Sequence, residues 1–311
     1  MSRRDGPPNA SALPLVTIVS PSLNQGPYIE TAIESVLTQD YPRLEYMVVD
    51  GGSTDGTIET LRRYGDRLRW VSERDEGQAA AINRGFALGS GEILAWLNCD
   101  DYYEKGAVSR VVDCILHRPE LMLIYGAARY VDAHGRDLGP CPEVEPFDLE
   151  RLVHYGDIIA QPAAFFRRKA FEAVSGLDEA LHWALDYDLW IRIGRRFPVL
   201  YVDELLACYR LTGANKTTRG GRARFDEIAA VGRRHGAGGL PTAFRIEQLA
   251  GAIRDAPSLF RQARWSEAFR TVARGIGDVL SSTRAVRALL GALLRRLSLS
   301  GSPRPRAGAP R

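Results

Sequence analysis

The sequence of 311 residues has few cysteines and no long apolar run. Its four cysteines lie far apart, at Cys99, Cys114, Cys141 and Cys208. None of them forms a Cys-x-x-Cys pair, so the spacing favours neither a structural zinc site nor a disulfide framework. No 18 apolar residues run together, and the first 14 residues lack the apolar segment of a signal peptide, so we predict no membrane span. These absences favour a cytoplasmic protein.

Two common nucleotide-binding motifs are also missing, because the sequence contains neither GxxxxGK[ST] nor GxGxxG. The positive charge, in contrast, is concentrated at one end. Residues 241–311 hold thirteen Arg and no Lys against four acids, a net +9, whereas residues 1–240 carry −6. This basic segment contains no recognisable nucleic-acid-binding module, so nucleic acid is not expected as a partner.

The first third of the sequence alternates short apolar runs with helical periodicity. Strands are predicted at 15–21, 45–50, 68–73 and 91–96, and helices at 28–38, 57–64 and 77–88. The first strand is continuously apolar and β-branched, which is typical of burial on both faces, whereas the last alternates like a half-buried strand. This order predicts an α/β fold with a parallel sheet, whose ligands bind beyond the carboxyl ends of the strands.

The rest of the sequence is mixed and then helical. Residues 121–139 predict two strands around a His-Gly turn, and a further strand is expected to open at Gln161. The pattern becomes helical from Phe225, and residues 283–299 form an amphipathic pattern with arginines on its polar side. The last residues, 301–311, have the composition of a disordered tail.

Acidic residues follow three of the predicted strands, at Asp50, at Glu73 and at the pair Asp100 and Asp101. Adjacent carboxylates repel each other unless a cation lies beside them, and Mg²⁺ or Mn²⁺ binds such pairs together with substrate phosphates. The alternative is a solvated loop in which both acids face water. Asp50 opens a Gly-Gly-Ser-Thr-Asp-Gly turn, which either faces a polar ligand or serves only as the start of the next helix.

A second acidic pair lies on a predicted helix that begins near Leu185. Asp186 and Asp188 are two positions apart, so their side chains point to different faces of the helix. One acid can therefore face a cleft while the other caps the helix or pairs with Arg192, four residues later than Asp188. The alternative is that both acids interact with the dipole of the first turn.

Three segments carry a resemblance to a known family. They read TIVSPSLNQGPYIETAIESVLTQDYPRLEYMVVDGGSTDGT, SERDEGQAAAINRGFALGSGEILAWLNCDD and QPAAFFRRKAFEAVSGLDEALHWALDYDLWIRI. In this order they resemble the family 2 nucleotide-sugar glycosyltransferases with a GT-A fold, in particular the bacterial enzymes of surface-polysaccharide and O-antigen synthesis. The resemblance covers about two thirds of the chain.

The resemblance implies a GT-A (Rossmann-like), mostly parallel sheet flanked by helices, with a C-terminal helical extension. It divides the chain into a flexible leader (1–14), a GT-A domain (15–215), a helical region (216–300) and a disordered tail (301–311). Within the GT-A domain, residues 15–104 are the nucleotide-binding half and 105–215 the acceptor half.

The resemblance also implies the roles of individual residues. The nucleotide sugar is expected at Pro21, Ser22, Asn24, Asp50, Gly51, Ser53, Asp75, Gln78 and Asp100. Asp100 and Asp101 are expected to hold Mg²⁺ or Mn²⁺, and Asp186 is expected to be the catalytic base. Gln161, His182 and Trp183 are candidates for contacting a sugar or the acceptor, as is Tyr187, although packing in the core is the alternative for Trp183. Gly51 stands where many members carry a second acid.

The function implied is inverting, metal-dependent sugar transfer from a nucleotide-diphosphate sugar, UDP-linked by expectation, to a saccharide or lipid-linked oligosaccharide. A glycosidase is disfavoured, because neither acidic pair by itself provides two carboxyls on opposite sides of a bond. A non-catalytic nucleotide-sugar-binding or scaffold protein of a polysaccharide assembly complex remains the alternative. The arginine-rich helix at 283–299 either contacts an anionic membrane at its inner, cytoplasmic face or packs on the body of the protein.

Overall fold

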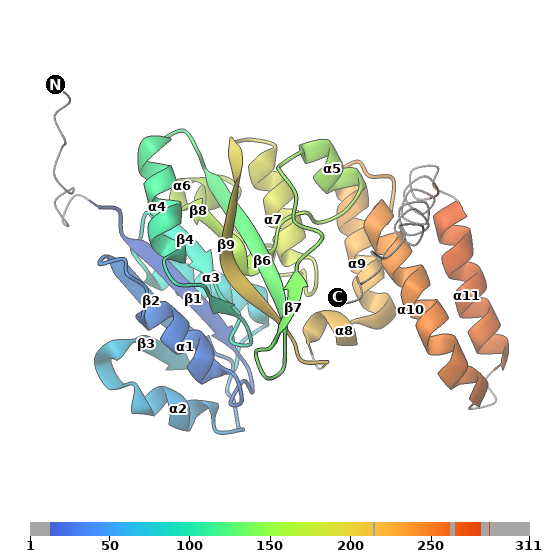
Figure 1. Ribbon diagram of the computed structural model, residues 1–311, viewed down its shortest axis with the longest axis horizontal. Helices are drawn as coiled ribbons and strands as arrows, with labels where there is room; N and C mark the ends of the chain where they lie inside the picture. Colours follow the sequence, from blue (N-terminus) through green and yellow to red (C-terminus); the bar gives the residue numbers. More distant parts are fainter. Residues whose placement is uncertain (1–12, 214, 262–264, 281–285, 287–311) are drawn as a thin grey trace, which may run out of the picture.

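The computed structural model describes residues 13–213, 215–261, 265–280 and 286 (Figure 1). Its elements in chain order are β1 (Val16–Ser22), α1 (Ile29–Leu37), β2 (Leu44–Asp50), α2 (Thr57–Arg63), η2 (Gly65–Arg67), β3 (Arg69–Ser72), α3 (Gln78–Leu88), β4 (Ile93–Trp96), β5 (Tyr102–Tyr103), α4 (Ala107–His117), β6 (Leu123–Asp132), β7 (Asp137–Pro140), α5 (Leu149–His154), η3 (Gln161–Ala163), β8 (Ala164–Arg167), α6 (Arg168–Ala173), α7 (Leu185–Gly194), β9 (Val199–Leu211), α8 (Lys216–Arg219), α9 (Gly221–Arg234), α10 (Thr242–Arg261) and α11 (Trp265–Leu280). The strands and helices predicted before residue 97 are all present, with ends within two residues of the expected ones.

Among the described residues, no helix has both the length and the apolarity that a membrane span requires.

The described strands form one nine-stranded sheet in the order β3-β2-β1-β4-β8-β6-β9-β5, with β7 paired to β6. β3, β2, β1 and β4 are parallel neighbours. β8 runs antiparallel to β4 and β6, whereas β6 and β9 are parallel to each other. The predicted α/β class is confirmed, and the described sheet is mixed, with four parallel and four antiparallel strand pairings.

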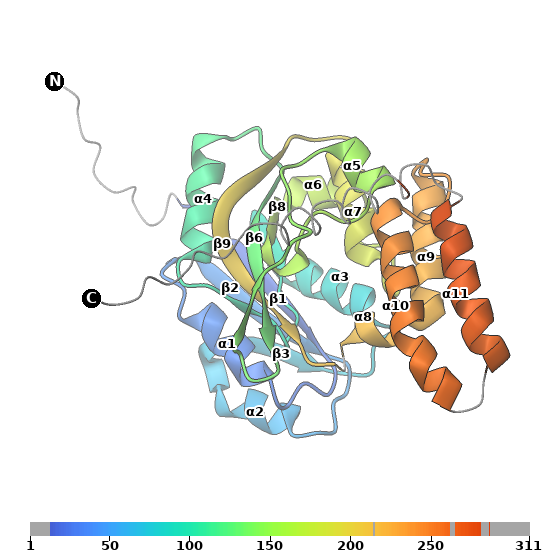
Figure 2. The same cartoon turned by 45° about the vertical axis from the view of Figure 1, so that its right-hand side comes forward.

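Helices cover both faces of this sheet (Figures 1 and 2). α1, α2 and α4 pack on one face, and α3, α6 and α7 pack on the other. Strand β4 lies in the middle of the sheet, between β1 and β8, and all four of its residues are buried. Leu94 and Trp96 contact one set of helices, whereas Ile93 and Ala95 contact the other. The prediction of a half-buried strand here is therefore wrong, because both faces of the sheet are covered.

Two boundaries in the second half of the chain also differ from expectation. Gln161 lies in η3, and β8 begins only at Ala164. Pro162 has no N–H and a fixed φ, so it suits the turn and not a strand. The helical pattern that begins at Phe225 starts nine residues too late, since α8 begins at Lys216, the first residue of the helical region 216–300 that the resemblance implies. The glycines at 220 and 221 weaken the helical pattern without preventing the helix.

The C-terminal helices lie beside the sheet domain and contact it directly (Figure 1). α10 and α11 pack side by side, with Leu249 of α10 against Gly275 and Val279 of α11. Leu13 and Pro14 are the last two residues of the predicted leader. The Leu13 carbonyl accepts a hydrogen bond from Arg43, and the Pro14 carbonyl accepts one from the Tyr41 hydroxyl. The helix expected at 283–299, most of the leader and the tail at 301–311 lie outside the described residues, Val286 excepted.

The close packing of α3 on β1 predicts the effect of one substitution. A Cβ atom on Gly85 would lie 2.5 Å from Cγ1 of Val19, so Gly85→Ala must displace the helix or the strand. We expect a loss of about 1–3 kcal/mol in the free energy of unfolding, measured by urea denaturation. Gly251→Ala in α10 is the matched control, since its Cβ would lie 3.8 Å from Arg254. The control is expected to be neutral or more stable by up to about 1 kcal/mol, and equal effects would contradict this packing.

Candidate active site

The carboxylate of Asp50 organises the loop that follows β2. Asp50 is 1% exposed and accepts hydrogen bonds from the amides of Gly52 (3.0 Å) and Ser53 (2.9 Å). The hydroxyls of Ser53 and Ser72 also donate to it. A buried carboxylate needs several donors of this kind to remain charged. Asp50 thus fixes the backbone of the loop, and the loop in turn presents its other groups at the sheet edge.

The loop after β1 is joined to the loop after β2. Asn24, whose φ is +54°, donates its amide to Ser53 Oγ (2.7 Å) and accepts from the Thr54 amide at Oδ1 (2.9 Å). The Gly51 amide donates to the Ser22 carbonyl (2.8 Å). The structure therefore brings together most residues that the sequence assigns to the nucleotide. They are Pro21, Ser22, Asn24, Asp50, Gly51 and Ser53.

Asp75 joins this group from the loop that follows β3. Its carboxylate lies against the backbone of Gly51, where a Cβ atom would be 2.9 Å from Asp75 Oδ2. An acidic side chain at position 51 would thus occupy the same space as Asp75. Glu73, which comes first in this loop, is exposed, and its carboxylate pairs with Arg84 at 2.7 Å. Of these two carboxylates, that of Asp75 lies against the predicted nucleotide site, whereas Glu73 contacts Asp50 through its backbone amide.

Asp100 and Asp101 follow β4 and are held by the end of β9. Asp101 is 2% exposed, and its Oδ1 accepts the Arg210 amide at 2.8 Å. Arg210 Nε donates to the Asp100 carbonyl (2.8 Å), and Asn215 Nδ2 donates to Asp100 Oδ2 (3.0 Å). Burial raises the pKa of both carboxyls, and for Asp101 the Asp100 carboxylate raises it further. The solvated-loop alternative is therefore excluded for Asp101.

The chemistry of this acidic pair suits a hard divalent cation. Carboxylate oxygens are the ligands that Mg²⁺ or Mn²⁺ prefers, and such a cation would have to displace the proton that burial favours at Asp100 and Asp101. Among the described residues, no cluster of three or more His, Cys, Asp or Glu side chains is placed to hold a metal ion. Two carboxylates leave most of the coordination sphere to water and to the oxygens of a ligand.

A chain of neutral amides leads away from the acidic pair. Lys216 Nζ donates to Gln78 Oε1 (2.9 Å), and Gln78 Nε2 donates to Asn98 Oδ1 (2.8 Å). Asn98 Nδ2 donates to Gln161 Oε1 (2.9 Å), whose Nε2 donates to the Trp96 carbonyl (2.8 Å). This chain connects α3, the end of β4, η3 and α8. Gln78 is predicted to contact the nucleotide sugar, and Gln161 is predicted to contact a sugar or the acceptor substrate. The two side chains therefore belong to one hydrogen-bonded network.

Asp186 lies in a pocket of about 260 Å³ that Gln161, a member of this network, also lines. The pocket is lined by Gln161, Trp183, Asp186 and Tyr209, and also by Asp157, Arg224 and Glu247. Burial raises the pKa of Asp186, while the Lys216 and Arg224 charges oppose the rise. Burial and the Asp186 carboxylate raise the pKa of Asp157 well above its ordinary value. Asp186 and Asp157 thus line the pocket together with Glu143 and Glu247, and Asp157 had no signal in the sequence.

The backbone before α7 is held by one carboxylate from α9. Glu227 accepts the amides of His182 (2.9 Å), Trp183 (2.6 Å) and Ala184 (2.8 Å). The Trp183 ring is half-buried and lines the pocket, so the core alternative for it is not supported. His182 is exposed and packs edge-on against Trp183. Tyr187 is 2% exposed and donates to the Leu152 and Val153 carbonyls, so its hydroxyl has a structural role.

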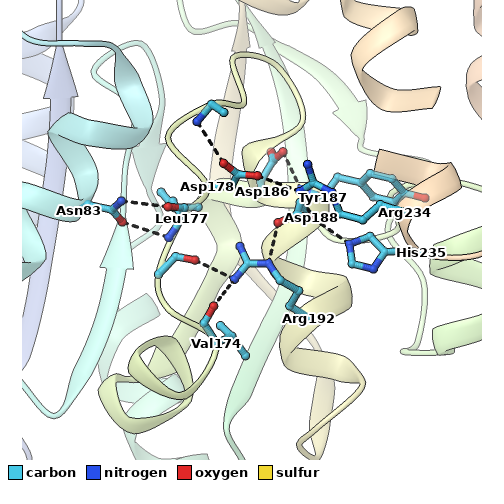
Figure 3. A network of polar contacts seen from close by, with 12 residues as sticks. Asn83, Val174, Leu177, Asp178, Asp186, Tyr187, Asp188, Arg192, Arg234 and His235 are labelled. Carbon is cyan, nitrogen blue, oxygen red and sulfur yellow. Dashed lines mark hydrogen bonds and ion pairs between the residues drawn. The ribbon is translucent and has the colours of Figure 1, made fainter. Parts of the chain in front are cut away.

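Asp188 points to the other side of α7 from Asp186 (Figure 3). It is fully buried, accepts Arg192 Nε at 2.6 Å and lies 2.8 Å from His235 Nε2. Burial alone would raise the pKa of Asp188, but the His235 hydrogen bond and the Arg192 guanidinium lower it below its ordinary value. The prediction that one acid of this pair faces a cleft while the other pairs with Arg192 is confirmed.

The sequence did not reveal several residues that complete the site. Asn215 and Lys216 follow β9, and Arg224, Glu227 and Glu247 lie on α9 and α10. The only local signal for them is that Asn-Lys follows a strand whose end reaches the acidic pair. The predicted division at residue 215 therefore passes through the site, since residues on both sides of it contribute.

Known proteins of similar fold are glycosyltransferases. S. aureus TarS 1–349, solved in complex with UDP-GlcNAc, superposes with a TM-score of 0.58 at 15% identity over 87% of this chain and 74% of that chain. The mannosyltransferase PcManGT from Pyrobaculum calidifontis, solved with GDP-Man and Mn²⁺, gives 0.56 at 21% identity over 94% and 83%. The fold is therefore that of the GT-A glycosyltransferases.

Sequence comparison defines the family. The model of glycosyl transferase family 2 matches residues 17–174. An uncharacterized glycosyltransferase of Rickettsia conorii is 32% identical over 220 residues, which is 66% of this chain and 35% of the relative. Chondroitin synthase of Escherichia coli is 27% identical over 212 residues, which is 67% and 30%. This chain spans about a third of the length of these relatives, and it belongs to glycosyl transferase family 2.

The buried position of Asp188 predicts a pH-dependent loss of stability in Asp188→Asn. Because the folded-state pKa of Asp188 is lowered, its contribution is present above the unfolded carboxyl pKa and is lost as the pH falls. We expect a loss of about 3 kcal/mol at pH 7, which shrinks below about pH 4.

Urea denaturation across this pH range measures the effect. Asp178→Asn is the matched control, because Asp178 and Asp188 both form an ion pair with Arg234 but Asp178 is partly exposed. The control is expected to lose only about 0–1 kcal/mol in the free energy of unfolding. A loss for Asp188→Asn that is as small as that of the control, or that does not vary with pH, would contradict the assignment.

Proposed function

We propose that this chain transfers a sugar, with inversion, from a nucleotide-diphosphate sugar to a saccharide or lipid-linked acceptor in surface-polysaccharide synthesis. The observation that carries the proposal is the arrangement of three acids. Asn98 donates to Asp101 of the acidic pair (3.5 Å) and to Gln161 (2.9 Å), and Gln161 lines the pocket that contains Asp186. Family membership and relatives such as chondroitin synthase support sugar transfer.

The donor is proposed to lie along the sheet edge. Its base and ribose lie near Asp50, Gly51 and Asp75, and its diphosphate lies near Asp100 and Asp101. UDP is the proposed nucleotide, which the UDP-GlcNAc complex of TarS supports and the GDP-Man complex of PcManGT leaves open. Mg²⁺ or Mn²⁺, when bound at Asp100 and Asp101, supplies a positive charge that stabilises the departing diphosphate.

Asp186 is proposed to accept the proton of the acceptor hydroxyl. Its buried position raises its pKa toward neutral pH, which favours proton transfer by a carboxylate. One base and one leaving group are enough for a single in-line displacement, which inverts the anomeric configuration. Trp183, Tyr209 and Gln161 line the same pocket and are proposed to contact the sugars.

A donor screen tests this proposal. The purified chain is incubated with a panel of UDP- and GDP-sugars and Mn²⁺ or Mg²⁺, and release of the nucleoside diphosphate is measured. We expect slow hydrolysis of one donor that stops with EDTA and transfer of the sugar with inverted configuration to an acceptor. Donor binding without turnover over a broad acceptor panel would favour the non-catalytic alternative. Sugar release from a glycan in EDTA without a nucleotide sugar would indicate a glycosidase.

Substitution of Asp186 tests the base. Asp186→Asn is expected to lower kcat by about 10²–10⁴-fold, because the substitution removes the carboxylate that is proposed to take the proton of the acceptor hydroxyl. Donor binding and the free energy of unfolding should stay near those of the unmodified chain. Asp188→Asn is the matched control on the same helix, and its folded fraction should retain transfer. The reverse result, with Asp188→Asn inactive and Asp186→Asn active, would show that the wrong carboxylate was chosen.

A further inference from the structure

Lys216 occupies a central position in the site. It is the first residue of α8 and follows Asn215, whose side chain donates to Asp100 Oδ2 at 3.0 Å. Asn215 also accepts the Thr212 amide (2.7 Å) and donates to the Arg210 carbonyl (2.7 Å), so the loop after β9 is held at both ends. This anchoring places the Lys216 ammonium beside Gln78, 2.9 Å from its Oε1.

Charged groups from several elements face the ammonium. Asp186 of α7 and Glu227 of α9 attract it, whereas burial disfavours its charge, and the pKa of Lys216 is lowered to about 8 as a result. His182 lies close enough that burial and the Lys216 charge lower the pKa of its imidazole. The ammonium therefore lies close to the Asp186 carboxylate, and Asn215, the residue before it, donates to Asp100 of the acidic pair.

Two other cations described in the cleft, Arg210 and Arg224, each make several contacts through their guanidinium groups. Arg210 donates to the carbonyls of Asp100, Asp132 and Ala133, and its guanidinium lies between two tyrosine rings. Arg224 forms a bidentate ion pair with Glu247, at 2.7 and 3.2 Å. Lys216, in contrast, donates to a neutral amide. An amide orients the ammonium without neutralising it, so the positive charge remains for a ligand.

The amide chain explains why the charge is preserved. Gln78 is held by Asn98, and Asn98 is held by Gln161, so each group between Lys216 and the Trp96 carbonyl is neutral. An aspartate at position 98 would place a further negative charge in this chain, next to Asp101. A cation with spare donors in a partly buried cleft is suited to bind an anion.

We propose that the Lys216 ammonium binds the diphosphate of the donor and stabilises its negative charge as the glycosidic bond breaks. This inference rests on the proposed function. In the reaction, the bond from the anomeric carbon to the diphosphate oxygen breaks, and its electron pair stays on that oxygen. The new bond forms from the acceptor oxygen to the anomeric carbon, and the acceptor proton moves to Asp186. The charge that leaves with the diphosphate thus develops beside the acidic pair, which is contacted by Asn215, the residue that Lys216 follows in the chain.

Binding of UDP and GDP to the full chain tests the contact, with uridine and guanosine as ligands that lack the diphosphate. Calorimetry with Mn²⁺ present is run on the unmodified chain, Lys216→Gln and Lys216→Arg. We expect Lys216→Gln to bind the preferred diphosphate about 10–100-fold more weakly and its nucleoside unchanged, because only a charged hydrogen bond is lost. Lys216→Arg should recover part of the affinity. Lys169→Gln, an exposed lysine of α6, is the matched control and should change nothing.

Kinetics with the preferred donor provide a second readout. Lys216→Gln is expected to lower kcat by at least about tenfold, beyond any change in KM, since charge on the leaving diphosphate grows in the transition state. For the unmodified chain, kcat/KM should fall as the pH rises above about 8, because the ammonium then loses its proton. In Lys216→Arg this decline should be absent, since the guanidinium stays charged.

The outcomes separate this inference from the proposed function. If the unmodified chain binds neither diphosphate and turns over no donor, the proposed function fails and this inference fails with it. If the unmodified chain binds and turns over a donor, but Lys216→Gln matches it in diphosphate affinity and kcat, only the role of Lys216 is overturned. Equal weakening of nucleoside and diphosphate binding, or a lower free energy of unfolding, would indicate a structural role and would also overturn it.

Discussion

The hydrogen bond from the Arg210 amide to the Asp101 carboxylate joins the two halves of the sheet domain at the site. Asp101 follows β4, the strand on which the parallel half ends, and Arg210 lies at the end of β9. Because Asp101 is buried, the bond forms away from water, where an unpaired carboxylate would be strongly disfavoured. The Arg210 amide reaches the Asp101 carboxylate with β9 paired to β6 in the observed register. The loop that follows β9, with Asn215 and Lys216, is thereby placed over the acidic pair.

Helix α7 is fixed by contacts at its start, along its length and on its buried side. Glu227 accepts three backbone amides before the helix, Asp188 joins the helix to His235, and Trp190 stacks on Trp96 with ring centroids 5.3 Å apart. The last contact connects α7 directly to β4. Asp186 and the acidic pair therefore belong to one rigid unit, in which their separation is set by packing in the core and not by the loops alone.

The sequence predicted secondary structure and side-chain orientation correctly where a local pattern of residues determines them. The alternation of apolar runs and helical periodicity before residue 97 predicted every β-strand and α-helix there. The spacing of Asp186 and Asp188 predicted that the two acids lie on different sides of α7. Burial of β4 was mispredicted, since small residues that alternate with apolar ones do not reveal that both faces are covered. Lys216, Glu227 and Asp157 could not be found, because packing between distant segments gives them their partners. Asp75 was placed by resemblance, but its contact with Gly51 is visible only in three dimensions.

The Glu227 contact has a consequence for how this chain can be divided. Helix α9 follows β9, the last strand of the sheet. The carboxylate of its Glu227 nevertheless accepts hydrogen bonds from three backbone amides that immediately precede α7 and Asp186. A fragment that stops after β9 would leave these amides without that acceptor and Asp188 without His235. The sheet domain is therefore not an autonomous module, and exchanging it between relatives requires that α8 and α9 be exchanged with it.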